Sequence, residues 1–220
     1  MAKKTKKTSL AKSALIIVDV QNDFCPGGSL AVPHGNDVIA PLNRLMKKFR
    51  ENDSLIVATR DWHQEKTTHF EKWPSHCVRY TDGAKFHKNL ELPIEAGIAS
   101  KGFRKNEDAY SGFEGFVVTH HDDPDGSWHE ERPETLENFL KKYHKIKTLY
   151  IGGLATDYCV KATVIDALRL GFKVFLLEDA VRAVNIKPDD GAEAIAEMQK
   201  VGEKAGKNRF VLISTKEVLG

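Results

Sequence analysis

Residues 149–171, LYIGGLATDYCVKATVIDALRLG, carry the pattern that decides the fold. The apolar run 149–151 predicts a buried strand, and the two glycines that follow it predict a turn. Apolar residues at helical spacing come next, so we expect a helix that begins near Cys159 and ends at Gly171. In a parallel α/β sheet, ligands bind beyond the carboxyl ends of the strands. Cys159 is therefore a candidate nucleophile, and its place at a helix N-terminus predicts thiolate character.

The same alternation of strand and helix runs along the chain. Apolar runs predict further strands at 14–20, 54–59, 173–177 and 210–213, and helical spacing predicts further helices at 37–51, 133–144 and 188–205. This order predicts an α/β fold, a doubly wound and mainly parallel sheet with helices on both faces in three αβα layers. Residues 60–100 show little regular pattern, and such a long irregular stretch in a compact domain is usually functional.

Composition limits the class of protein. The 220 residues suit one domain, expected at 13–220 after a disordered, basic tail at 1–12. That tail holds five lysines and no acid, so acidic residues outnumber basic ones in the rest of the chain and no nucleic-acid partner is expected. No segment is apolar enough for a signal peptide or a membrane span, and three cysteines without paired spacing favour a reducing compartment. We expect a cytoplasmic protein with no membrane partner.

Two residues could activate the Cys159 thiol as a nucleophile. Asp19 follows the first predicted strand, so its carboxylate is expected at the same sheet edge as Cys159, where it could be a general base. The alternative is a turn residue, since aspartate is common in turns. Lys101 near a thiol and a carboxylate would lower the thiol pKa and keep the carboxylate ionised. The alternative is an ordinary surface lysine, one of 33 basic residues.

A second cluster follows the strand predicted at 54–59. Asp61 and His63 alternate in an extended segment and so face one side of it, and His69 and His76 come soon after. One carboxylate with several imidazoles suits zinc, iron or manganese better than calcium or magnesium, in a site with open positions. The alternative is a set of scattered polar loop residues.

Other residues in these loops allow weaker interpretations. Four aromatic side chains could stack on a planar substrate or could simply pack beneath the loops: Phe24, Trp62, Phe70 and Trp73. Cys25 and Cys77 are expected to be bystander thiols. Three further histidines lie among aspartates, where a solvated loop is expected rather than a metal site: His120, His121 and His129.

Several motifs occur in a fixed order: Asp19-x-Gln21-x-Asp23-Phe24, Thr59-Arg60-Asp61-Trp62-His63, His69-Phe70, Trp73-Pro74-x-His76-Cys77, Lys101-Gly102, Tyr110-Ser111-Gly112-Phe113 and Gly153-Leu154-Ala155-Thr156-Asp157-Tyr158-Cys159-Val160. In this order they resemble the nicotinamidase (pyrazinamidase) branch of the isochorismatase-like cysteine hydrolases. The resemblance runs from about Leu15 to about Ala180. The segment 116–132 departs from it by its length.

For the catalytic residues, the resemblance implies a triad of Asp19, Lys101 and Cys159. It also implies an oxyanion hole formed by the backbone N–H groups of Ala155 and Cys159, with a cis peptide between Leu154 and Ala155.

For the metal and the substrate, the resemblance implies one divalent ion held by Asp61, His63 and His76, with His69 as a further ligand in some members. Zinc is the expected ion, with iron or manganese as alternatives. The expected contacts to the pyridine ring are Phe24, Trp73 and Tyr110.

The expected reaction is hydrolysis of nicotinamide to nicotinate and ammonia through a thioester, in NAD salvage, with pyrazinamide as a further substrate. One alternative is a related amidohydrolase for N-carbamoyl or ureido substrates. The other is a non-catalytic, thiol-based binding or redox-sensing module. A homo-oligomer is compatible with the sequence.

Overall fold

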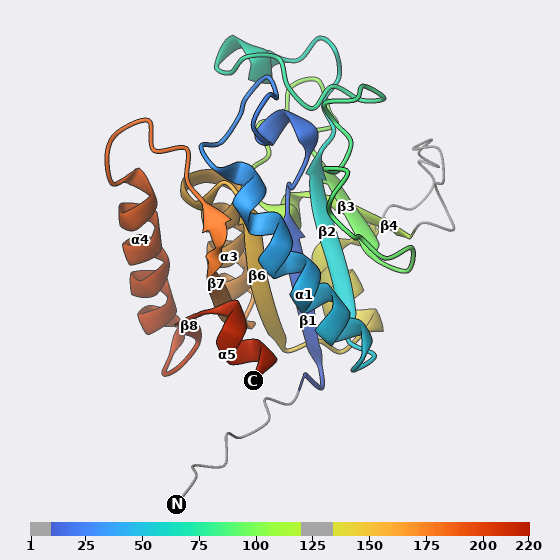
Figure 1. Cartoon of the computed structure of the whole chain (residues 1–220). Helices are drawn as coiled ribbons and strands as arrows, with labels where there is room; N and C mark the ends of the chain where they lie inside the picture. The colour runs from blue at the N-terminus through green and yellow to red at the C-terminus, as the bar shows by residue number, and fades with distance from the viewer. Residues whose placement is uncertain (1–9, 120–133) are drawn as a thin grey trace, which may run out of the picture.

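One twisted sheet runs through the middle of the molecule, with helices in front of it and behind it (Figure 1). The structure is a computed structural model that describes residues 10–119 and 134–220. Within these residues the sheet has eight strands: β1 Ser13–Val18, β2 Leu55–Asp61, β3 Gly97–Lys101, β4 Phe116–Thr119, β5 Glu134–Thr135, β6 Thr148–Leu154, β7 Lys173–Arg182 and β8 Phe210–Ile213.

The strand order is β5-β4-β3-β2-β1-β6-β7-β8. All neighbours from β3 to β8 in this order are parallel, whereas β4 is antiparallel to both β3 and β5. The predicted doubly wound, mainly parallel sheet is therefore confirmed.

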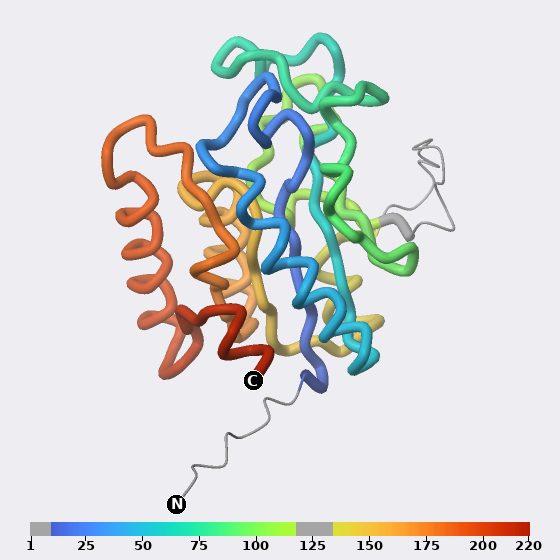
Figure 2. Tube along the Cα trace, viewed as in Figure 1, coloured from blue at the N-terminus to red at the C-terminus, as the bar shows by residue number. Residues whose placement is uncertain are grey.

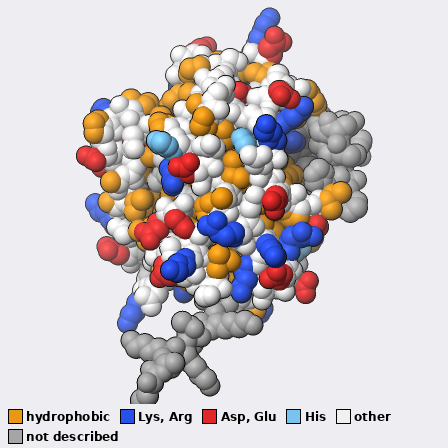
Figure 3. Space-filling model, in the orientation of Figure 1, with side chains coloured by type: hydrophobic (Ala, Val, Ile, Leu, Met, Phe, Trp, Pro, Cys, Tyr) orange, Lys and Arg blue, Asp and Glu red, His pale blue; other side chains and the backbone are white. Residues whose placement is uncertain are grey.

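The helices divide between the two faces of the sheet. They are α1 Ile39–Arg50, α2 Leu136–Asn138, α3 Lys161–Arg169, α4 Asp190–Ala205 and α5 Thr215–Leu219. Helices α1 and α5 cover one face, and α2, α3 and α4 cover the other (Figure 1). Among the described residues, no helix combines the length and the apolar composition needed to cross a bilayer. On the face drawn in Figure 3, basic and acidic side chains are interspersed.

The burial of β1 explains why residues 14–18 are all apolar. Every residue of this strand is buried, because the sheet is covered on both sides. Leu15 and Ile17 pack in the core on the α1 side, whereas Ile16 and Val18 pack in the core on the α3 side. The strand therefore links the two cores.

Several elements differ from the expected pattern. β5 lies in the range expected to be a helix, and α5 was not predicted. Gly152 and Gly153, expected in a turn, belong to β6 because parallel pairing with β1 keeps them extended. β3 was not predicted, because four of its five residues are glycine, alanine, serine and lysine. A Cβ at Gly97 would lie 3.2 Å from the Phe139 ring, so a larger residue there would require this ring to shift. β4 was not predicted either. The helix expected over 133–144 is a short α-helix followed by a π-helical turn, Phe139–Tyr143. Pro133, His120, His121 and His129 lie outside the described residues.

The carboxyl ends of β1, β2, β3 and β6 meet at one edge of the sheet. The segments that follow these strands cross over this edge at the top of the view in Figure 2, opposite the C-terminus. The predicted functional residues all come from these segments or from the strand ends beneath them.

Candidate active site and metal centre

Cys159 lies at this edge, between β6 and α3. It is buried in a π-helical turn, Thr156–Val160, so α3 begins after the thiol rather than at it. The N–H of Val160 donates to the carbonyl of Ala155 at 3.1 Å, which closes the turn. The peptide between Leu154 and Ala155 is cis, as expected.

Lys101 contacts the other two predicted catalytic residues, Asp19 and Cys159. It is the last residue of β3 and is fully buried, so it is not a surface lysine. Its Nζ lies 3.0 Å from Oδ2 of Asp19 and 3.4 Å from Sγ of Cys159, and it also pairs with Asp61. The parallel register that places Lys101 opposite Asp61 brings both to the same level of the sheet.

Asp19 occupies the turn after β1, with a φ of 48° in the left-handed region. Its N–H donates to the Thr59 carbonyl at 3.2 Å, and the Thr59 hydroxyl donates to its Oδ1 at 2.6 Å. Its Oδ2 pairs with the Lys101 ammonium at 3.0 Å and makes no other hydrogen bond among the described residues. A carboxylate oxygen of Asp19 also lies within 4.8 Å of Sγ of Cys159, which brings the carboxylate near the thiol proton.

The electrostatics correct one expectation. Burial raises the pKa of Asp19, and the nearby Asp61 carboxylate adds to the effect. Burial also raises the pKa of Cys159 well above that of an ordinary thiol, since Lys101 opposes but does not outweigh it. The prediction of thiolate character at rest is therefore wrong, because burial beside two carboxylates outweighs the lysine.

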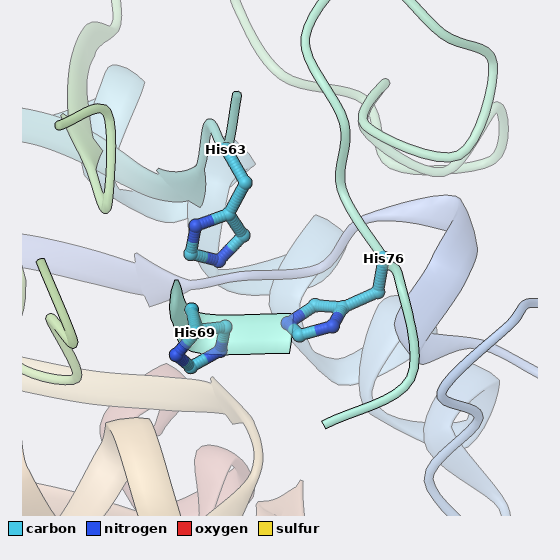
Figure 4. Close-up of side chains that lie close together, drawn as sticks. All are labelled: His63, His69 and His76. Atoms are coloured by element: carbon cyan, nitrogen blue, oxygen red, sulfur yellow. The ribbon is translucent and has the colours of Figure 1, made fainter. Parts of the chain in front are cut away.

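Three histidines converge from separate backbone segments, with their rings directed toward a shared space (Figure 4). One nitrogen of each ring lies within 4.8 Å of the others. The Nδ1 atom of each ring faces an oxygen: His63 the carbonyl of Gly102 at 2.9 Å, His69 Oδ1 of Asp108 at 2.5 Å and His76 the carbonyl of Pro74 at 2.7 Å. Because each of these oxygens is an acceptor, Nδ1 carries the proton and Nε2 keeps its lone pair.

Asp61 completes this cluster. Its Oδ2 lies 3.6 Å from Nε2 of His63 and 3.8 Å from Nε2 of His76. Ligand atoms about 2.0–2.2 Å from a tetrahedral zinc ion are separated by about 3.3–3.6 Å, so the spacing is close to that of a metal site. Burial opposes ionisation of Asp61, but the buried Lys101 ammonium outweighs it, and the pKa of Asp61 lies well below the usual range.

His63 provides a direct test of the fit. Its Nε2 is buried and has no hydrogen-bond partner among the described residues. A buried acceptor without a partner is costly unless a cation or a donor satisfies it. Three imidazoles and one carboxylate therefore fit a divalent ion of the zinc type.

A cavity lies beside the thiol and the metal ligands. Its lining residues are Phe24, Leu30, Val32, Asp61, His69, Trp73, His76, Ala109, Tyr110, Ala155, Tyr158, Cys159 and Val184. All three predicted substrate contacts are among them, and Trp73 Nε1 donates to the Tyr110 hydroxyl at 3.1 Å. Trp62 instead lies in the hydrophobic core, and Phe70 packs 5.5 Å from the His63 ring.

Several functional neighbours had no role in the sequence analysis. Thr59 holds Asp19, and Gln21 exchanges two hydrogen bonds with the backbone of Asp61 at 2.7 and 2.8 Å. Asp157 accepts the N–H groups of residues 184 and 185, next to the cavity wall. Register along β1 and β2 could have found Thr59, but nothing local in the sequence indicates Asp157.

The other two cysteines line no part of the cavity. Both are free thiols. Burial raises the pKa of Cys25 to about 11, and burial likewise raises the pKa of Cys77 well above the usual range. Neither has the contacts that Cys159 makes.

Comparison with known proteins places this geometry in a family. Residues 13–208 match the isochorismatase domain. The chain is 36% identical to the nicotinamidase of Escherichia coli over 208 residues, 86% of this chain and 92% of the relative. It is 35% identical to the nicotinamidase/pyrazinamidase of Mycobacterium tuberculosis over 193 residues, 84% and 94% of the two chains. The crystal structure of Pyrococcus horikoshii pyrazinamidase in complex with zinc aligns with a TM-score of 0.76 at 41% identity, covering 92% of this chain and 99% of that one.

Proposed function

The chain belongs to the isochorismatase family, and we propose that it is a nicotinamidase, a cysteine amidohydrolase that converts nicotinamide to nicotinate and ammonia. The observation that carries this proposal is the position of Lys101, whose ammonium contacts both the carboxylate of Asp19 and the sulfur of Cys159. That thiol lines a cavity with aromatic walls, and three of the proposed metal ligands, Asp61, His69 and His76, line the same cavity. Near-full-length relatives named nicotinamidase support the same reaction.

The raised pKa of the thiol determines the first step. Because burial keeps Cys159 protonated at rest, its proton must move as the sulfur attacks, and the nearby carboxylate of Asp19 is the acceptor. The thiolate that forms is stabilised by the Lys101 ammonium 3.4 Å away. The sulfur bonds to the carboxamide carbon, and the carbonyl oxygen becomes an oxyanion.

The remaining steps return the enzyme to its resting state. The N–H groups of Ala155 and Cys159 would hold the oxyanion, and losing one such donor typically costs about 100- to 1000-fold in rate. Asp19 gives its proton to the departing ammonia as the C–N bond breaks, which leaves a thioester. Asp19 then takes a proton from water, the hydroxide attacks the thioester, and nicotinate leaves as the thiol is reprotonated.

Asp61, His63, His76 and His69 would hold one divalent ion, and zinc is the ion we propose, with iron or manganese as alternatives. When bound, the ion supplies a Lewis acid that orients the pyridine nitrogen. A zinc complex of a 41% identical pyrazinamidase supports this choice.

The cavity wall supports a planar ring as the substrate. Phe24 and Trp73 would flank the ring, and the hydrogen bond from Trp73 to Tyr110 fixes one side of the wall. Pyrazinamide has the same carboxamide on a similar ring and is proposed as a second substrate. The physiological role proposed is NAD salvage in the cytoplasm.

A panel of substrates tests the proposal. Metal-loaded protein should release ammonia from nicotinamide and pyrazinamide faster than from N-carbamoyl or ureido compounds, because only the former present a ring nitrogen to the histidines. The Cys159→Ala variant should lose this activity, and Cys25→Ala, which removes a buried thiol outside the cavity, should keep it. A preference for ureido substrates would favour the related amidohydrolase, and no turnover of any compound would favour a non-catalytic module.

A further inference from the structure

His69 differs from the other two histidines in the partner of its ring. Nδ1 of His63 and of His76 each faces a backbone carbonyl, whereas Nδ1 of His69 lies 2.5 Å from Oδ1 of Asp108. A carboxylate partner fixes the tautomer of the imidazole. It also makes the other ring nitrogen a stronger electron-pair donor to a metal than a carbonyl partner does. Asp108 had no role in the motifs of the sequence.

The second oxygen of Asp108 is also engaged. Its Oδ2 pairs with Nζ of Lys72, which follows the same short turn, Thr68–Glu71, that carries His69. The carboxylate therefore bridges two side chains of one turn, and it is one-third exposed rather than deeply buried. The His69 side chain beneath it is only 4% exposed.

The backbone joins the same two segments beside this bridge. The Thr68 N–H donates to the Lys105 carbonyl at 3.1 Å, and the Thr67 hydroxyl donates to it at 2.8 Å. On the other side of Asp108, Trp73 donates to Tyr110. The turn that carries His69 is thus fastened to the loop after β3 at both ends.

We infer that Asp108 is a positioning residue for the metal centre: it orients His69 as a ligand and strengthens it through its carboxylate. The inference rests on the proposed metal-dependent function, since it requires an ion at the histidine cluster. Its measurable consequence is metal affinity. Removing the partner of a metal-bound histidine typically costs about 10- to 100-fold in metal affinity.

Zinc affinity of the full-length, metal-free protein tests the inference, measured by competition with a chromogenic chelator. Asp108→Asn should bind zinc about 10- to 100-fold more weakly than the wild type. The matched control is Glu107→Gln, because Glu107 is the neighbouring carboxylate and accepts from the Arg104 N–H at 3.2 Å rather than from a histidine. Its zinc affinity should be unchanged. Lys72→Met leaves the Asp108 carboxylate paired with His69. It should therefore lose less zinc affinity than Asp108→Asn.

A double-mutant cycle separates positioning from a general effect on the loop. In a His69→Ala background, Asp108→Asn should cause no further loss of zinc affinity, because the ring that it orients is absent. A loss of equal size in both backgrounds would show that Asp108 only supports the loop and would overturn the inference. Thermal unfolding of the metal-free variants identifies any variant that fails to fold. If Asp108→Asn fails to fold, the zinc affinity of Lys72→Met is compared with that of the wild type instead.

Ammonia release from nicotinamide is measured in parallel. The role of Asp108 and the proposed nicotinamidase function can then be rejected independently of each other. If the wild type is active and Asp108→Asn binds zinc normally, the inference is wrong and the proposed function stands. If the wild type is inactive but Asp108→Asn still weakens zinc binding, the inference stands and the proposed function is wrong. Absence of zinc binding by the wild type would overturn the inference directly.

Discussion

Nζ of Lys101 lies 3.4 Å from Sγ of Cys159, although 58 residues separate them in the chain. The same ammonium pairs with the carboxylates of Asp19 and Asp61. Burial disfavours the ammonium, but these carboxylates outweigh it and hold the pKa of Lys101 well above its usual value. The lysine is therefore charged at neutral pH and links the catalytic residues to the metal ligands.

Lys101→Met should abolish turnover and destabilise the fold. It leaves two buried carboxylates without their cation, and removing one partner of a buried ion pair costs about 3–5 kcal/mol. Urea denaturation gives the free energy of unfolding. Lys85→Met is the control, because Lys85 pairs with Asp82 on the surface, where an ion pair contributes only about 0–1 kcal/mol. Equal stability of the two variants would contradict the structural role of Lys101.

Gly102→Ala should disturb the metal centre through the backbone. Gly102 has a φ of +67°, and a Cβ there would lie 2.4 Å from Cε1 of His63. We expect a lower zinc content by elemental analysis as well as a loss of stability. Gly171→Ala is the matched control, since Gly171 has a φ of +85° but a Cβ there would meet nothing within 4 Å. That variant should lose about 1–2 kcal/mol from its left-handed backbone and keep its metal. Normal zinc content in Gly102→Ala would argue against His63 as a ligand.

Metal removal should lower both activity and thermal stability. A ligand that binds only the folded state stabilises it, so chelation should lower the midpoint of thermal unfolding, and added zinc should restore it. His63→Ala should show neither response. His34→Ala, which changes a histidine whose side chain is 80% exposed, should respond like the wild type. An identical response in His63→Ala would place the ion elsewhere.

Asp19→Asn should be inactive yet more stable than the wild type at neutral pH. Burial raises the pKa of Asp19 above 3.8, so the folded state favours its protonated form. The stability from that proton is complete below the unfolded pKa of about 3.8 and is lost as the pH rises through the folded pKa. The advantage of Asp19→Asn should therefore shrink as the pH falls toward 3.8. Unfolding curves measured across this pH range give the stability difference between Asp19→Asn and the wild type. A variant that is less stable than the wild type at neutral pH would contradict the prediction.

The sequence predicted which polar residues meet at one edge of the sheet, although it missed some of the strands. Asp19, Asp61 and Cys159 each follow a predicted apolar strand, and parallel strands bring such positions to one edge, where their ligand atoms lie within 4.8 Å of one another. β3 was missed because glycine, alanine, serine and lysine make up four of its five residues, and the tight contact of Gly97 with Phe139 is visible only in the folded chain. Strand pairing, not local pattern, makes Gly97–Lys101 extended.

The finer chemistry of the site also depends on contacts that no local pattern shows. Asp108 and His69 are 39 residues apart, and only the folded chain brings them together. The thiol pKa was predicted with the wrong sign, because a helix N-terminus is visible in the sequence but complete burial beside Asp19 and Asp61 is not.

Trapping the acyl-enzyme tests the central claim most directly. Turnover of nicotinamide by the metal-loaded protein is quenched in acid, and the digested protein is analysed by mass spectrometry. The account predicts a nicotinoyl thioester on the peptide that contains Cys159, with Cys25 and Cys77 unmodified. It also predicts that Cys159→Ala loses ammonia release by about 10⁴-fold or more. Ammonia release by Cys159→Ala at a rate near that of the wild type, with no acylated cysteine in either protein, would contradict it.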